Sequence, residues 1–219
     1  FGRTNKTTIV ASESTVLDMA GVPVERDVYP GELLIFGEGG TMESYSISQS
    51  TLHSHCFFEY VYFAHPAAKM ENQLVYDVRF RLGRALAQTF LKMNLELPDY
   101  VVPVPDTSRP AAQAMAETLS VPMREIILKN RYLGRTFIVR SQEERDAMAR
   151  QKYLYLDDKI RGKTILVVDD SIVRGTTAKM IVADLKKRGA LKIYFAVTCP
   201  PQTHPCYYGI DISTDKELI

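Results

Sequence analysis

The clearest pattern along the chain is a continuous apolar run over residues 164–168, which ends in two aspartates. A short apolar run with β-branched members is typical of a strand buried on both faces of a parallel sheet. Beyond a polar loop over 171–177, apolar side chains recur at helical spacing: Ala178, Ile181, Val182 and Leu185. Gly189 stands where a left-handed C-terminal cap is expected. This part of the chain therefore predicts a strand, a polar loop and a helix.

The same order of strand, polar loop and helix occurs earlier, over residues 100–119. Residues 100–104 predict a strand and 105–108 a short polar loop. Pro110 suits the first turn of the helix that follows.

Two further elements flank these units. Residues 75–91 predict a helix with one apolar stripe, formed by Val78, Leu82, Ala85 and Leu86. The arginines at 79, 81 and 84 are expected on its solvated face. Residues 191–198 predict another strand.

The first third of the chain has a different pattern. Residues 7–36 show short apolar segments and turns, with strands expected over 7–14 and 17–24 and again after the Pro30–Gly31 turn. This pattern predicts a small antiparallel sheet. The Gly- and Ser-rich stretch 38–50 is interpreted as a linker. The aromatic run 53–66 predicts a buried strand with a packed cysteine, because the spacing of its His and Cys residues matches no usual zinc site.

Composition narrows the class of protein. The 219 residues are 46% hydrophobic, enough for one full α/β core with something attached, and the net charge is +1. This charge favours neither nucleic acid nor a membrane surface as a partner. Three cysteines and eight methionines indicate a reducing, cytoplasmic setting. No signal peptide or membrane span is evident. The chain starts without Met, and we expect it to be a fragment of a longer protein.

The loop over 171–177 has the parts of a phosphate cradle. Gly175 allows close approach of the backbone, Thr176 and Thr177 offer hydroxyls, and the helix start presents free N–H groups. Asp169 and Asp170 would repel a phosphate, but they suit the hydroxyls and bound metal of a ribose 5-phosphate. The alternative is that the acids only end a strand and Thr176 only caps a helix. The phosphate hypothesis requires both carboxylates to lie at the mouth of the loop and not against the core.

Four segments resemble a known family. They resemble motifs of type I phosphoribosyltransferases, and most of all of the glutamine 5-phosphoribosyl-1-pyrophosphate (PRPP) amidotransferases. The segments are VVDDSIVRGTT (167–177), KNRYLGRTFI (129–138), VPDTS (104–108) and CFFEYVYFAHP (56–66). The resemblance covers about residues 10–219. It implies an α/β fold, with a mostly parallel twisted sheet and helices on both faces. Residues 1–50 would be a β remnant of an Ntn-type glutaminase domain plus linker, and 51–219 the phosphoribosyltransferase domain.

The resemblance also implies site residues. Those expected to bind PRPP are Asp106, Thr107, Ser108, Asp169, Asp170, Ser171, Arg174, Gly175, Thr176 and Thr177. Mg²⁺ is expected at Thr107, Asp169 and Asp170. A cationic lid over pyrophosphate is expected from Lys129, Arg131, Tyr132 and Arg135, which would act as the catalytic residues.

The implied reaction is displacement of magnesium pyrophosphate from PRPP by ammonia, giving 5-phosphoribosylamine for purine biosynthesis. In relatives glutamine supplies the ammonia, but this chain lacks the amino-terminal cysteine of that chemistry, so no glutaminase activity is expected from it. Purine nucleotides as inhibitors and a homo-oligomeric state are further expectations. The alternatives are a base-salvage phosphoribosyltransferase and a PRPP-binding regulator without turnover.

Several positions depart from the family pattern. His65 replaces an arginine, Ala67 and Ala68 replace Asp-Ser, and Arg140 replaces a proline in the lid. Cys56 and Cys206 match two of the four cysteines that hold an iron–sulphur cluster in one branch of the family. Because such a cluster needs about four thiolates, none is predicted here.

Overall fold

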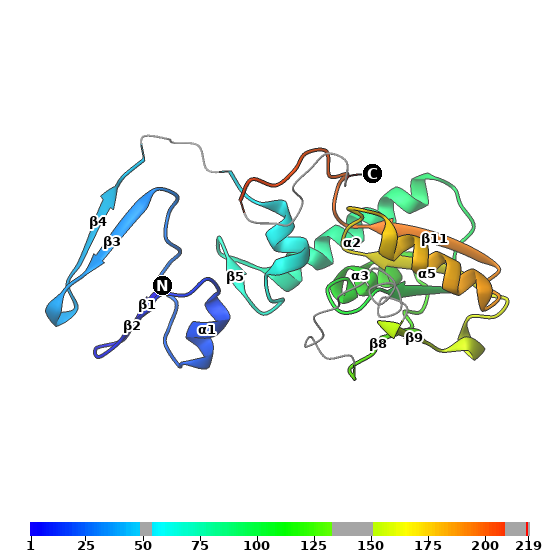
Figure 1. Cartoon of the computed structure of the whole chain (residues 1–219), viewed down its shortest axis with the longest axis horizontal. Helices are drawn as coiled ribbons and strands as arrows, with labels where there is room; N and C mark the ends of the chain where they lie inside the picture. The colour runs from blue at the N-terminus through cyan, green and yellow to red at the C-terminus, as the bar shows by residue number, and fades with distance from the viewer. Residues whose placement is uncertain (49–53, 133–150, 209–217, 219) are drawn as a thin grey trace, which may run out of the picture. The chain divides into compact units, whose positions relative to one another are not determined.

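The computed structural model describes residues 1–48, 54–132, 151–208 and 218. The chain divides into two compact units, Phe1–Val78 and Arg79–Ile219, and each is described by itself (Figure 1). The division falls inside one helix. The domain boundary after residue 50, which the family resemblance implies, stays a prediction.

The second unit is built on a parallel sheet with the strand order β11-β10-β7. Its strands are β7 (Tyr100–Pro103), β10 (Thr164–Asp169) and β11 (Lys192–Val197). Every residue of β10 is buried, because this strand pairs in parallel with β11 on one side and β7 on the other. The central buried strand predicted from the apolar run is confirmed.

Helices cover both faces of this sheet, as expected. On one face, α2 (Val75–Lys92) and α3 (Arg109–Leu119) pack with Leu166 and Val168 of β10. On the other face, α5 (Thr176–Lys187) places Ile181 and Leu185 against Ile165 and Val167. Successive residues of a strand point to opposite faces, so one run of four apolar residues, 165–168, serves two cores.

The orientation of α2 differs from the prediction. Arg79 is only 3% exposed, whereas Ala85, expected inward, is exposed. The inward line runs instead through Gly83 and Ala87, and a side chain on Gly83 would overlap the backbone of Ala111 in α3. Close approach of α3 at Gly83 therefore sets which side of α2 faces the core, which hydrophobicity alone does not reveal.

A short antiparallel pair joins β8 (Ile127–Lys129) to β9 (Tyr153–Tyr155). The buried residues Ile126, Ile127 and Tyr153 belong to the same apolar cluster as α5. Lys129 is the last residue of β8. A 3₁₀ turn, η3 (Asp157–Lys159), follows β9.

The first unit contains small antiparallel pairs, in agreement with the sequence. These are β1 (Gly2–Arg3) with β2 (Thr8–Ile9), β3 (Glu32–Phe36) with β4 (Met42–Ser46), and β5 (Lys69–Met70) with β6 (Gln73–Leu74). A 3₁₀ turn, η1 (Glu38–Gly40), connects β3 and β4. The linker predicted over 38–50 is therefore wrong for residues 38–46, where the chain forms η1 and then β4, which pairs with β3. The strand predicted over 17–24 is wrong, since helix α1 (Ser14–Met19) begins this stretch and buries Leu17.

The strand predicted in the aromatic run is also wrong. Residues Glu59–Phe63 form a π-helical turn, η2, and Cys56 is exposed and not packed. Tyr60, Val61 and Ala64 are buried. This spacing of one and four positions places them on one side of a helical turn, whereas a strand would alternate them. No helix among the described residues is both long and apolar enough to cross a lipid bilayer.

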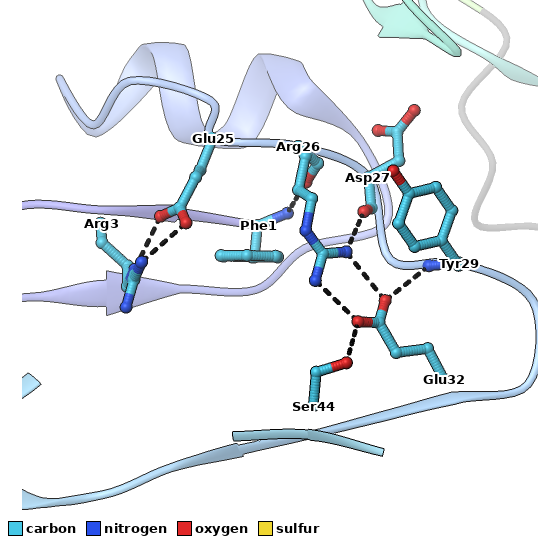
Figure 2. A network of polar contacts seen from close by, with 8 residues as sticks. All are labelled: Phe1, Arg3, Glu25, Arg26, Asp27, Tyr29, Glu32 and Ser44. Atoms are coloured by element: carbon cyan, nitrogen blue, oxygen red, sulfur yellow. Dashed lines mark hydrogen bonds and ion pairs between the residues drawn. The ribbon is translucent and has the colours of Figure 1, made fainter. Parts of the chain in front are cut away.

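Glu32 is the centre of a polar network in the first unit (Figure 2). Its two carboxylate oxygens accept hydrogen bonds from the Arg26 guanidinium at 2.6 and 2.8 Å. The Ser44 hydroxyl donates at 2.6 Å and the Tyr29 amide at 2.9 Å. The Arg26 guanidinium also lies 4.9 Å from the centre of the Tyr29 ring. The bonds from Arg26, Ser44 and Tyr29, in that order of importance, lower the pKa of Glu32 to about 2.

This network predicts a specific acid sensitivity. A carboxyl group whose pKa is lowered on folding stabilises the protein above its ordinary pKa, and that stability is lost as the pH falls towards the lowered value. We therefore expect Glu32→Gln to be less stable than the wild type at pH 7, and to lose less further stability between pH 4.5 and about 2. Melting temperatures across this range measure both effects. Glu38→Gln, at an exposed position of η1, is the control; equal pH dependence of Glu32→Gln and the wild type would contradict the prediction.

Candidate active site

Two loops meet at the carboxyl edge of the parallel sheet. The loop over 104–108 leaves β7 and the loop over 170–175 leaves β10. Because β7 and β10 are parallel neighbours, both loops emerge at the same edge, and the Val104 amide donates to the Val168 carbonyl at 2.9 Å. The carboxyl edge of an open α/β sheet is where ligands bind in this class of fold.

Asp170 connects the two loops. Its side chain accepts hydrogen bonds from the Thr107 hydroxyl of the first loop and from the Ser171 hydroxyl, at 2.6 Å, of the second. Asp170 is 7% exposed, yet these described contacts are polar groups of the loops. The structure thus brings together Thr107, Asp170 and Ser171 as the sequence predicts, with the carboxylate of Asp170 turned towards the loops.

Asp169 is equally buried, at 7% exposure. Its Oδ1 accepts the amide of Asp170 at 2.9 Å. Burial and the neighbouring charge of Asp170 raise the pKa of Asp169 to about 7, while the charge of Lys152 acts in the opposite direction. The acid pair therefore concentrates negative charge in a poorly solvated place.

The polar loop after β10 leads directly into the start of α5. Gly175 precedes the helix with a φ of 69° and a ψ of −5°, in the left-handed region that glycine tolerates. The alternative that Thr176 caps α5 is not realised, because Thr176 is the first helical residue and Gly175 occupies the cap position. Arg174 and Thr176 are exposed and Thr177 is half-buried, so this loop presents polar side chains and helix N–H groups at the same edge.

The cations expected over pyrophosphate are only partly described. Lys129 reaches the first loop, where its Nζ lies 3.1 Å from Asp106 Oδ2. Arg131 and Tyr132 are exposed, with the Tyr132 side chain almost fully open to solvent. Arg135 and Arg140 lie outside the described residues. Ser108 is buried, and its hydroxyl donates to the Val104 carbonyl within its own loop, so it shapes the loop from inside.

Thr198 is not among the site residues predicted from the sequence. Its hydroxyl donates to the Asp170 carbonyl at 3.1 Å, and the Cys199 amide donates to the same oxygen at 2.8 Å. The Thr198 amide also donates to the Asp169 carbonyl at 3.2 Å. Thr198 directly follows β11, the other parallel neighbour of β10. The rule that parallel strands end at one edge could have found it.

We predict that loss of the Thr198 hydroxyl loosens the acid pair. Thr198→Val removes one hydrogen bond of about 1 kcal/mol. If this free energy is lost in the transition state, kcat/KM for the release of pyrophosphate from PRPP should fall about fivefold. Thr198→Ser keeps the donor and should retain the wild-type value. Thr118→Val is the matched control, because the Thr118 hydroxyl also donates to a carbonyl, that of Ala114 within α3. Equal kcat/KM for Thr198→Val and wild type would show that the bond does not position the acids.

The chain belongs to the family described as the phosphoribosyl transferase domain, whose model matches residues 76–219. It is 42% identical to an amidophosphoribosyltransferase of Methanothermobacter thermautotrophicus over 221 aligned positions, which cover 100% of this chain and 45% of that protein. The enzyme of the same name from Saccharomyces cerevisiae is 41% identical and matches 96% of this chain and 42% of its own length. The chain thus spans less than half the length of these curated relatives.

Solved structures agree. A glutamine PRPP amidotransferase from B. subtilis, complexed with ADP and GMP, aligns with a TM-score of 0.83 at 41% identity, covering 95% of this chain and 45% of that chain. A structure described as the allosteric regulatory enzyme of purine biosynthesis aligns with a TM-score of 0.82 at 40% identity, covering 94% and 43%. The predicted type I phosphoribosyltransferase fold is confirmed by these matches.

Among the described residues, no group of three or more His, Cys, Asp or Glu side chains could hold a metal ion. A metal at the candidate site would therefore rest on the two aspartates, hydroxyl groups and oxygens of the substrate. Cys56 and Cys206 belong to different units, and Cys199 is buried. That the chain holds no iron–sulphur cluster stays a prediction.

Proposed function

We propose that the protein is an amidophosphoribosyltransferase, which displaces pyrophosphate from C1 of PRPP with ammonia to give 5-phosphoribosylamine. The single observation that carries the proposal is the contact between Thr107 and Asp170, since it joins the two loops that the sequence assigns to pyrophosphate and ribose phosphate. Family membership and relatives of that name, about 40% identical along the chain, support the same activity.

Each loop has a distinct role in this proposal. The residues from Ser171 to Thr177 and the first N–H groups of α5 hold the 5-phosphate. Asp169 and Asp170 accept hydrogen bonds from the ribose hydroxyls. The loop of Asp106, Thr107 and Ser108 lies next to the pyrophosphate, and the cationic residues balance the charge of that leaving group: Lys129, Arg131 and Arg135, with Tyr132 beside them.

The donor set fits Mg²⁺. Two carboxylates and the Thr107 hydroxyl are oxygen donors, which hard cations prefer. When bound, Mg²⁺ would neutralise charge that develops on pyrophosphate. Thr107, Asp169 and Asp170 are the residues that would hold it. The protein itself supplies position and electrostatic stabilisation, and no covalent nucleophile is needed.

Partners follow from the same proposal. In the whole protein, glutamine would be the source of ammonia. Purine nucleotides are proposed as regulators, because the B. subtilis relative was solved with ADP and GMP. A homo-oligomer and a cytoplasmic location are proposed as well.

Pyrophosphate release tests the activity directly. The chain is mixed with PRPP, Mg²⁺ and an ammonium salt, and pyrophosphate is quantified by a coupled assay. We expect release that depends on ammonium and does not occur when adenine, guanine or uracil replaces it. Release driven by a base would identify a salvage enzyme, and PRPP binding without release would identify a regulator; either result contradicts the proposal.

A further inference from the structure

Asp106 uses both of its carboxylate oxygens on cations of the protein. Oδ1 accepts from Arg109 at 2.9 Å and Oδ2 from Lys129 at 3.1 Å. Arg109 is held on its other side by Glu125, at 2.7 Å from Nε. The four side chains therefore form a line of alternating charge, Glu125–Arg109–Asp106–Lys129, with no net charge.

Electrostatics argues against Asp106 as a direct ligand of the substrate. It precedes Thr107 in the loop assigned to pyrophosphate, where a carboxylate would repel the polyanion. A lysine has three donors on a flexible stem, and only one of them is used by Asp106, so Lys129 can bind Asp106 and a phosphate oxygen at the same time.

Lys129 also needs a partner that orders it. It is the last residue of β8, and its side chain is half-exposed. A long side chain loses substantial rotamer entropy on binding, and a group that holds it beforehand lowers that cost. Asp106 can act as this group because Arg109, the first residue of α3, fixes its other oxygen.

We propose that Asp106 is a positioning residue, which holds the Lys129 ammonium at the pyrophosphate loop and does not itself bind the substrate through its carboxylate. This inference rests on the proposed function and revises the role that the sequence suggested for Asp106. It also assigns Arg109 as the anchor of Asp106. Removing Asp106 should therefore act only through Lys129.

A double-mutant cycle tests this dependence. The KM for PRPP and the kcat are measured with ammonium for the wild type, Asp106→Asn, Lys129→Met and the double variant. We expect Asp106→Asn to raise KM about two- to fivefold, the size of an exposed ion pair, with a smaller change in kcat. The KM and kcat of the double variant should lie within about twofold of those of Lys129→Met. Once Lys129 is gone, the loss of Asp106 has no further effect, because Asp106 acts only through Lys129. Asp106→Glu should restore much of the wild-type KM.

The matched control is the ion pair of Lys192 and Glu96. It has the same distance of 3.1 Å and a similar exposure, but Lys192 begins β11 at the opposite edge of the sheet. Glu96→Gln should leave KM unchanged. The proposal would be overturned if the two single effects on KM multiplied in the double variant, or if Asp106→Asn had a lower KM than the wild type. Either result would show that Asp106 meets the substrate itself.

A second measurement does not depend on activity. Lysine amines are acylated with a limiting reagent, and the labelling of each lysine is followed by mass spectrometry. Asp106→Asn should raise the labelling rate of Lys129 and leave that of Lys192 unchanged. Glu96→Gln should raise the labelling rate of Lys192 and leave that of Lys129 unchanged. An unchanged rate at Lys129 overturns the inference even if the enzyme is active. A wild type without turnover overturns the proposed function instead, and with it the role of the pair in catalysis.

Discussion

Asp170→Asn is expected to lower kcat by about a hundredfold or more, the usual size of effect when a group that stabilises charge in the transition state is lost. Asparagine keeps the shape of the side chain and can still bond the hydroxyls of Thr107 and Ser171. What it removes is the negative charge that the proposal assigns to the ribose hydroxyls and the metal. The measurement is pyrophosphate release with saturating ammonium and PRPP.

Thermal stability distinguishes this loss from a folding defect. The charge of Asp170 contributes to raising the pKa of its buried neighbour Asp169, so its removal relieves repulsion. We therefore expect the melting temperature of Asp170→Asn to equal or exceed that of the wild type. Asp158→Asn, which removes an acidic group from an exposed position of η3, should change neither quantity. Full turnover of Asp170→Asn with ammonia would exclude the assigned role.

The central sheet could be predicted from the sequence because its signal is local. The run over 165–168 is apolar at every position, and a strand with two covered faces requires that pattern. The rotation of α2 could not be predicted, since it depends on the approach of α3 at Gly83, a contact between residues far apart in the chain. The strand predicted in the aromatic run 53–66 was wrong for a related reason. Aromatic residues favour strands in general, but here Tyr60, Val61 and Ala64 are buried on one side of a helical turn.

The candidate site shows the same division. Loop composition and acidic residues locate its two halves, and the parallel register of β7 and β10 joins them without further information. The roles of individual side chains are harder to obtain, because they depend on partners. Asp106 has the residue type of a ligand, but its oxygens are taken by Arg109 and Lys129. Thr198 has an ordinary residue type, and only its place after β11 reveals that it holds the backbone of the acid pair.

Gly175→Ala should raise the KM for PRPP about tenfold or more, because a methyl group would stand where the backbone must approach the 5-phosphate. Gly175 is buried and has a φ of 69°. Alanine in this left-handed conformation costs about 1 kcal/mol or somewhat more, so a modest fall in melting temperature is also expected. Backbone strain alone could disturb activity, and a control must reproduce the strain without the phosphate contact.

Gly162 offers that control. Its φ is +70°, nearly the same as that of Gly175, and nothing lies within 4 Å of the position of an added Cβ. It lies in the turn before β10, at the opposite end of the strand from the acid pair. Gly162→Ala should therefore lower the melting temperature by a similar amount and leave the KM for PRPP unchanged. If both variants bind PRPP equally well, the loop before α5 does not hold the phosphate. If only Gly175→Ala loses affinity while the two share the same loss of stability, the loss arises from the contact with the ligand, because the strain is common to both.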